Sequence, residues 1–148
     1  MPDYSVDGNQ NAAASTTILS ISVGATVRRL AIFYLTIGAA ATPADQANNC
    51  QVNRLTADGV GTAVTPQALD PAEPAAVGTG LEDHTTEPTY TANAVLLSFS
   101  FNTRANYQFY ANPGRELKSP GTLSNGLGLR FVVATGTQLH EATLHYFE

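Results

Sequence analysis

The residues closest to a metal-binding set are His140, Glu141 and His145. Imidazole and carboxylate groups are common ligands of zinc and related ions. The surrounding segment alternates apolar and polar residues as a β-strand does, and successive side chains of a strand point to opposite faces. Positions 140 and 145 differ by an odd number and therefore face opposite sides. We predict that they do not share an ion and that the chain carries no metal and no cofactor.

A second group, Glu82, Asp83, His84 and Glu87, brings acids and a base together within a short stretch. General acid–base catalysis needs such groups within about 3 Å of a substrate in a shaped pocket. Here they lie in a proline-rich stretch without flanking apolar residues to hold them. We interpret them as a solvated loop or a contact between subunits, and place Glu82 and His84 at a partner interface.

Two other patterns do not lead to a catalytic prediction. Gly126-Leu127-Gly128 is followed by β-forming residues, whereas a phosphate-binding loop needs a helix N-terminus. No serine has the Gly-x-Ser-x-Gly setting of a nucleophile elbow. Cys50 is the only cysteine, so it cannot form an internal disulfide. We therefore predict that the protein is not an enzyme and has no small-molecule substrate.

The elements that would position these residues are strands, and no segment shows a helical stripe with caps. The segment 30–37 is apolar on both faces, as expected of a central strand. A short strand over 61–65 is expected to pair back across the Asp58-Gly59 turn. Proline and glycine turns between short strands predict a single-domain, all-β, antiparallel β-sandwich with jelly-roll topology. The predicted strands are 16–23, 27–39, 50–56, 61–65, 94–101, 106–111, 116–118, 128–134 and 138–147.

Two segments are predicted to lie outside the sandwich domain of residues 16–148. Residues 1–15 have little to bury and are expected to form an extended arm, which is either a frayed terminus or a latch on a neighbouring subunit. The stretch 66–94 contains four prolines and is expected to be one long loop, either partner-binding or disordered. Tyr4 on the arm and Pro71 and Pro74 on the loop are therefore candidate interface residues.

Composition restricts the class of protein. A chain of 148 residues with 43% hydrophobic residues can bury a single core, and no apolar run reaches the roughly 20 residues that span a membrane. No secretory signal is visible at the start. Seven scattered Lys and Arg residues and a net charge of −5 argue against nucleic acid and anionic membranes as partners.

Charged residues are unusually sparse, at 13% of the chain against about 25% in typical soluble domains. Free monomers normally carry a denser cover of mixed charges. Either neutral polar residues solvate this surface or partners cover much of it. If partners cover it, Arg28, Arg29, Arg104 and Arg115 are natural bidentate donors to their carboxylates.

Several segments resemble small virion proteins of tailed bacteriophages. The likeness extends from Arg28 to Arg130 and rests on scaffold and turn motifs. These are Arg28–Gly38, Ala41–Asp45, Arg54–Gly59, Thr65-Pro66, Leu69–Ala72, His84–Thr89, Pro113–Leu117 and Asn125–Arg130.

The resemblance implies a head cement, or decoration, protein. Such a protein would be made in the host cytoplasm and sit on the capsid surface of the virion. It would form a homotrimer and clamp neighbouring subunits of the major capsid protein. A tail or head–tail joining position stays open, as does a carbohydrate-binding tail module that uses Tyr90, Tyr107 and Tyr110 for stacking.

Overall fold

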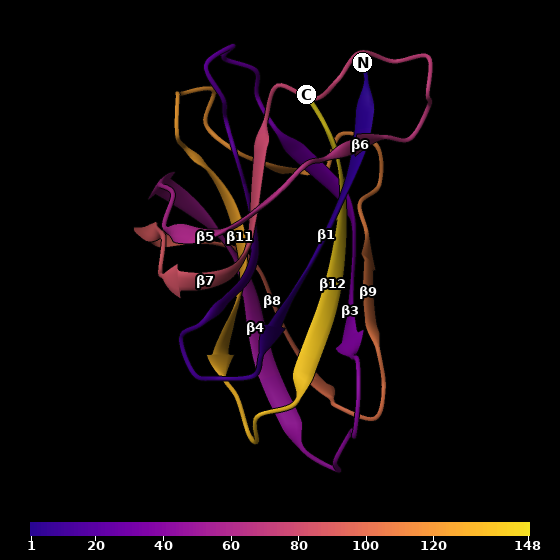
Figure 1. Ribbon diagram of the computed structural model, residues 1–148, viewed down its shortest axis with the longest axis vertical. Coiled ribbons are helices and arrows are strands. Elements are labelled where there is room, and N and C mark those ends of the chain that lie inside the picture. The colour runs from indigo at the N-terminus through magenta and orange to yellow at the C-terminus, as the bar shows by residue number, and fades with distance from the viewer.

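The computed structural model describes residues 1–148 and consists of twelve β-strands joined by turns and loops (Figure 1). The strands are β1 (Asp3–Asn11), β2 (Thr17–Ser22), β3 (Ala31–Ala39), β4 (Ala47–Ala57), β5 (Val60–Val64), β6 (Gln67–Ala68), β7 (Thr79–Thr86), β8 (Thr89–Asn102), β9 (Tyr107–Tyr110), β10 (Leu117–Lys118), β11 (Gly126–Val133) and β12 (Leu139–Phe147).

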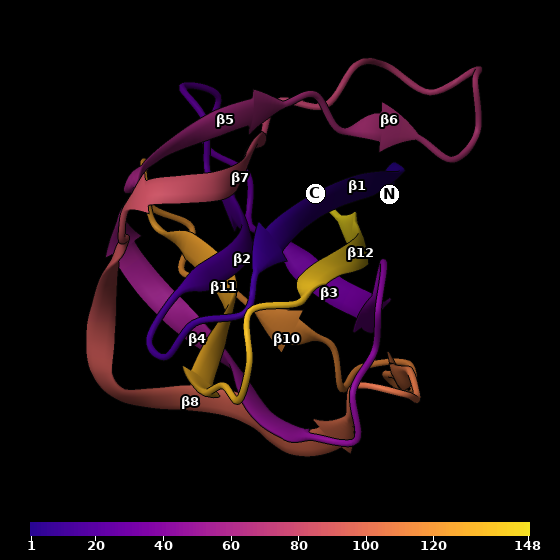
Figure 2. The ribbon, with the colours of Figure 1, turned by 60° about the horizontal axis from the view of Figure 1, so that its bottom comes forward.

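The strands form two antiparallel sheets. In sheet A the order is β10-β3-β12-β1-β6, and β9 pairs with β3 beside β10. In sheet B the order is β5-β7-β2-β11-β4-β8. Figure 2 shows β7, β2, β11 and β4 on one side of the molecule and β1, β12 and β3 on the other. The predicted all-β, antiparallel β-sandwich is thus confirmed.

One hydrophobic core lies between the sheets. Its 21 buried residues come from both sheets and include Leu144 and Tyr146 of β12 and Leu127 and Leu129 of β11. Because side chains alternate along each strand, the residues between these core positions face away from the core. The single cysteine, Cys50, lies in this core, where burial raises the pKa of its thiol to about 12. A thiol that is buried in this way is unreactive and contributes only to the packing of the core.

The N-terminal segment corrects the sequence prediction, because it is a strand inside sheet A and not an arm. All nine residues of β1 pair with β12, from Asp3 opposite Phe147 to Asn11 opposite Leu139. Tyr4 and Val6 are in the core. The segment holds only these two large apolar residues, so its pattern is too weak to predict a strand. Pairing with β12 supplies the hydrogen bonds that local composition cannot.

The stretch 66–94 is also corrected, since it contains β6, β7 and the start of β8. Pro66 and Pro88 precede β6 and β8, and Pro71 and Pro74 lie in the connection between β6 and β7. Proline lacks a backbone N–H, and here it falls between strands and not inside them. The short strand β5 pairs with β7 and not with β4, so the predicted hairpin across Asp58-Gly59 is wrong.

Neighbouring residues of β1 test its place in the sheet. Val6 is 1% exposed, whereas Asp7 faces solvent. We expect Val6→Ala to lower the free energy of unfolding by about 1–3 kcal/mol, because it removes two buried methyl groups and leaves a cavity. Asp7→Ala should change it by less than about 0.5 kcal/mol. Urea unfolding followed by circular dichroism measures both. If neither substitution changes the free energy of unfolding, the segment does not belong to the sandwich.

Candidate functional site

Five aromatic rings lie together on the outer face of sheet A. They belong to Phe33, Tyr34, Tyr110, His145 and Phe147, and we call this set the aromatic face. On β12 the residues on either side of His145 point into the core, so His145 and Phe147 point outward. Their neighbours across the sheet are on β3 and β9, with Tyr34 between His145 and Tyr110. Three strands therefore contribute to one surface.

The rings of the aromatic face contact one another in a connected group. The centroids of Phe33 and Phe147 are 4.4 Å apart and nearly parallel, at 26°. Tyr34 lies 4.6 Å from Tyr110 and 4.8 Å from His145. Such pairs contribute about 0.5–1.5 kcal/mol each beyond area burial. Tyr110 nevertheless remains 73% exposed, so it is the most solvent-accessible member of the group.

A register shift explains how Phe33 reaches this surface. The pairing of β12 with β3 passes from His145–Tyr34 to Tyr146–Ile32, which leaves Phe33 as an extra residue in β3. A bulge of this kind redirects a side chain relative to regular alternation. Phe33 stacks on Phe147 and lies 5.9 Å from the ring of His145. The bulge therefore adds a ring that a regular strand would place elsewhere.

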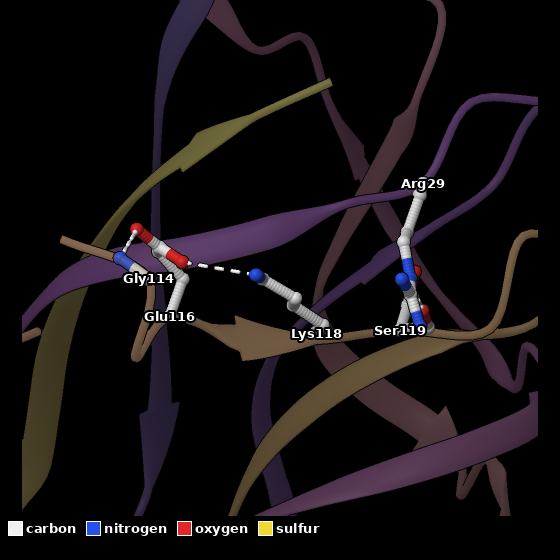
Figure 3. Close-up of polar contacts among 5 residues, drawn as sticks. All are labelled: Arg29, Gly114, Glu116, Lys118 and Ser119. Atoms are coloured by element: carbon white, nitrogen blue, oxygen red, sulfur yellow. Dashed lines mark hydrogen bonds and ion pairs between the residues drawn. The ribbon is translucent and has the colours of Figure 1, made fainter.

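The aromatic face has charged residues at both margins. Asp3 on β1 pairs with Phe147, and Lys118 on β10 pairs with Ala31. Lys118 Nζ also lies 3.1 Å from Glu116 Oε2, and Gly114 donates a backbone hydrogen bond of 2.8 Å to Glu116 Oε1 (Figure 3). That N–H, with a smaller effect from Lys118, holds the pKa of Glu116 below its ordinary value.

One end of the sandwich carries both chain termini (Figure 1). It consists of Met1 and the connections 23–30, 69–78 and 119–125, and we call it the termini end. Backbone hydrogen bonds join the connections 23–30 and 119–125, including Ser124 N to Val23 O at 2.9 Å, and Leu69 N donates to Asp3 O of β1 at 3.0 Å. Its exposed apolar side chains are 44–85% accessible and are Met1, Val27, Leu69 and Leu123.

The structure brings four of the predicted interface residues to the termini end. Arg28, Arg29, Pro71 and Pro74 are all exposed there. Arg29 Nε donates a hydrogen bond of 3.0 Å to the Ser119 carbonyl (Figure 3), while Arg28 has no protein partner within hydrogen-bonding distance.

Arg104 and Arg115 are exposed too, but elsewhere. Arg104 lies between β8 and β9, and Arg115 lies between β9 and β10, near the aromatic face. The predicted set of arginines thus divides among three places on the surface and does not form one patch.

Tyr4, Glu82 and His84 are not surface contacts, which corrects their predicted role. Tyr4 lies in the core and donates a hydrogen bond of 3.1 Å to the Pro74 carbonyl. Glu82 Oε2 accepts hydrogen bonds from the backbone and side chain of Asn9, at 2.8 and 2.9 Å. His84 is buried, because residues 79–86 form β7 beside β2 and do not form a solvated loop.

His84 belongs to a network on the outer face of sheet B. Its Nε2 lies 3.1 Å from Ser20 Oγ, a spacing that a nucleophile and its base also use. Ser20 is only 1% exposed, so no substrate carbonyl can reach it. Burial lowers the pKa of His84, although Glu87 and Asp58 raise it in part. The pair therefore serves the structure.

Glu87 and Tyr90 continue this network. Both carboxylate oxygens of Glu87 accept the Thr17 backbone N–H at 3.0 Å, and the Thr17 hydroxyl shares a 2.6 Å hydrogen bond with Tyr90. The guanidinium of Arg130 lies 4.7 Å from the centre of the Tyr90 ring, within cation–π range. A Cβ at Gly128 would lie 2.4 Å from the Tyr90 hydroxyl, so only glycine allows this close approach.

The remaining candidates do not converge on a site. His140 is buried against Phe131 while His145 faces outward, which confirms that the two face opposite sides. No group of three His, Cys, Asp or Glu residues is placed to hold a metal ion.

The main pocket, of about 400 Å³, is lined largely by β5, β7 and Asp58. The fold consists of strands and has no helix of the length and apolarity needed to cross a membrane.

The predicted stacking tyrosines are not brought together. Tyr90 lies beneath Arg130, and Tyr107 stacks on Phe99 with centroids 3.8 Å apart, so only Tyr110 presents an open ring. Sequence reasoning missed His145 and Phe147 as surface rings. The alternation of residues in 138–147 could have predicted this, since it places His145 and Phe147 on the other face of the strand from Leu144 and Tyr146.

Comparison with protein-family models, with curated proteins and with solved structures gives no match.

The buried histidine predicts a pH dependence of stability. Because burial holds the pKa of His84 below its ordinary value of 6.5, the folded chain binds fewer protons than the unfolded chain. Stability should therefore fall as the pH drops below about 6.5, by about 1.4 kcal/mol for each unit of pKa lowering. The raised pKa of Asp58, caused by its burial, acts in the opposite sense at more acidic pH.

Replacing the imidazole isolates this effect. We expect His84→Gln to lose less stability than the wild type between about pH 7.5 and pH 5, as measured by urea unfolding at each pH. Asp7→Asn, a change at an exposed residue of β1, is the control. An identical pH dependence for His84→Gln and the wild type would contradict the assignment.

Proposed function

We propose that this chain is a non-enzymatic structural protein that binds and bridges other protein subunits, in the manner of a decoration protein on the head of a tailed phage. The observation that carries the proposal is the termini end, where exposed apolar side chains and Arg28 lie on adjacent loops. Contiguous exposed apolar surface on a soluble protein is typical of interaction sites. The phage context rests on the sequence resemblance.

The construction of the termini end supports a binding role. Backbone hydrogen bonds join two of its loops, 23–30 and 119–125, so these loops are not left free. Loops that are ordered before binding lose less conformational entropy when they meet a partner. Apolar anchors with neighbouring arginines are the residue types that dominate protein interfaces. The major capsid protein is the proposed partner, with its carboxylates meeting Arg28 and Arg29.

Strand order supports the architecture expected for such a protein. The subsets β1-β12-β3-β9 and β2-β11-β4-β8 each run as neighbours across one sheet. We infer a jelly roll of these eight strands, in which β5, β6 and β7 are an insertion between β4 and β8. Connections of this architecture gather at the two ends of the sandwich, and one of those ends is the termini end. A position in the virion tail or at the head–tail joint would use the same surface.

Two apolar side chains of the termini end allow a direct test. We expect the double variant Val27→Ser, Leu123→Ser to bind undecorated heads of the encoding phage at least about tenfold more weakly than the wild type. Co-sedimentation over a range of protein concentrations measures the affinity. Both side chains are more than half exposed, so the substitutions should leave the fold intact.

Val60→Ser is the matched control, because Val60 is 59% exposed on β5, away from the termini end. It should bind as the wild type does. The proposal fails if the wild type does not co-sediment with heads, or if the double variant binds as tightly as the control.

A further inference from the structure

We infer that the aromatic face is a self-association surface, on which a second copy of this chain packs about a two-fold axis parallel to the strands of sheet A. This inference concerns a different surface from the termini end and goes beyond the proposed function. It sets the number of copies and the orientation of the partner, which the termini end does not.

The aromatic face has the composition of an interface centre. Its five members carry no formal charge when His145 is neutral, and burial lowers the pKa of His145 despite the nearby Asp3. Clustered aromatic residues with charges confined to the margin are typical of the buried centre of a protein interface. Tyr110 stands out from this surface at 73% exposure, as an anchor side chain does before it is covered.

The charges at its margins favour a second copy as the occupant. One row across the outer face of sheet A reads Asp3, Phe147, Ala31 and Lys118, with each residue paired to the next. The row thus has an acid at one end, a base at the other and apolar residues between them. Three strand spacings separate its ends, which is about 14 Å. If the same row of a second copy lies against it in the reverse order, each charged end meets the opposite charge.

A two-fold axis parallel to the strands performs this reversal. It places Asp3 opposite the partner's Lys118, and Lys118 opposite the partner's Asp3, as an isologous interface requires. A two-fold axis along the row would instead place Asp3 opposite the partner's Asp3, and like charges in contact are unfavourable. The charge pattern therefore selects one orientation.

The neighbouring row fits the same rotation. It reads Ser5, His145, Tyr34 and Tyr110 across β1, β12, β3 and β9. Reversal brings the protruding Tyr110 over the partner's Ser5, a small residue, and brings His145 over the partner's Tyr34. A large side chain thus meets a small one, while two rings face each other in the centre. The same two-fold axis therefore gives favourable contacts in both rows.

Lys118 can serve both its own chain and a partner. It already pairs with Glu116, but an ammonium group has three donors and can bind two carboxylates. Arg115 adds a further exposed positive charge on the β10 side, and Asp7 adds an exposed negative charge on β1. The two margins therefore keep opposite net charge after the Glu116 pair is counted.

The molar mass in solution tests the surface. We expect sedimentation equilibrium of the wild type to reach twice the 15.5 kDa chain mass at or below about 200 µM. Tyr110→Asp should raise the dimer dissociation constant at least about tenfold, because it buries a charge in the interface centre. Val60→Asp, on sheet B, is the control and should dimerise as the wild type does. Thermal unfolding verifies that both variants fold.

Charge reversal tests the axis. Asp3→Lys and Lys118→Asp should each weaken the dimer by about fivefold, since each places like charges together at two equivalent positions. The double variant should recover most of the wild-type affinity, because it restores opposite charges at both positions. Loss without recovery would overturn the proposed axis.

A monomer at about 200 µM, a trimer, or a Tyr110→Asp variant as dimeric as the control would overturn the inference. These outcomes are separate from the proposed function, because Tyr110→Asp leaves the termini end unchanged and should still bind phage heads as a monomer. If the protein fails to bind heads, the proposed function is contradicted, while the molar masses still decide whether the chain dimerises.

Discussion

The alternation of side chains along β12 is the constraint on which the two surfaces of sheet A depend. Leu144 and Tyr146 point into the core, while His145 and Phe147 point outward. The strand pairs with β1 on one side and with β3 on the other, so its register also sets theirs. A slip of one residue would exchange the two faces and place the rings of the core in solvent. The core therefore determines where the aromatic face lies.

The two sheets treat their outer faces differently. Residues between β4 and β8 cover Ser20 and Ser22 of β2. Ser20 shares a hydrogen bond with His84, and Ser22 forms hydrogen bonds with Asp58 and Thr79. This half of sheet B is thus closed by polar contacts from its own chain. The outer face of sheet A has no comparable cover, and it carries rings where sheet B carries serines. The outer face of sheet A therefore leaves the ring of Tyr110 open to solvent.

The sparse charge has a structural counterpart in this arrangement. The only side-chain ion pair joins Glu116 and Lys118, at the margin of the aromatic face. Elsewhere, hydrogen bonds from neutral donors take the place of ion pairs. Asn102 donates to the Asp45 carboxylate, for example, and Asn49 donates to the Ser100 hydroxyl. Salt should consequently have little effect on the fold itself, because screening acts on charges and not on buried apolar area.

The sequence alone determined the strand class of most of the chain and the opposite faces of His140 and His145, because both follow from a repeat of two residues that is local. The same repeat separated Tyr110 from Tyr107 and Phe109 on β9. Only the tertiary structure decided that residues 3–11 are a strand, that β5 pairs with β7, and that Phe33 joins His145 and Phe147. These features arise from pairing between distant segments, where the partner supplies the hydrogen bonds and the register, and no local pattern specifies a partner.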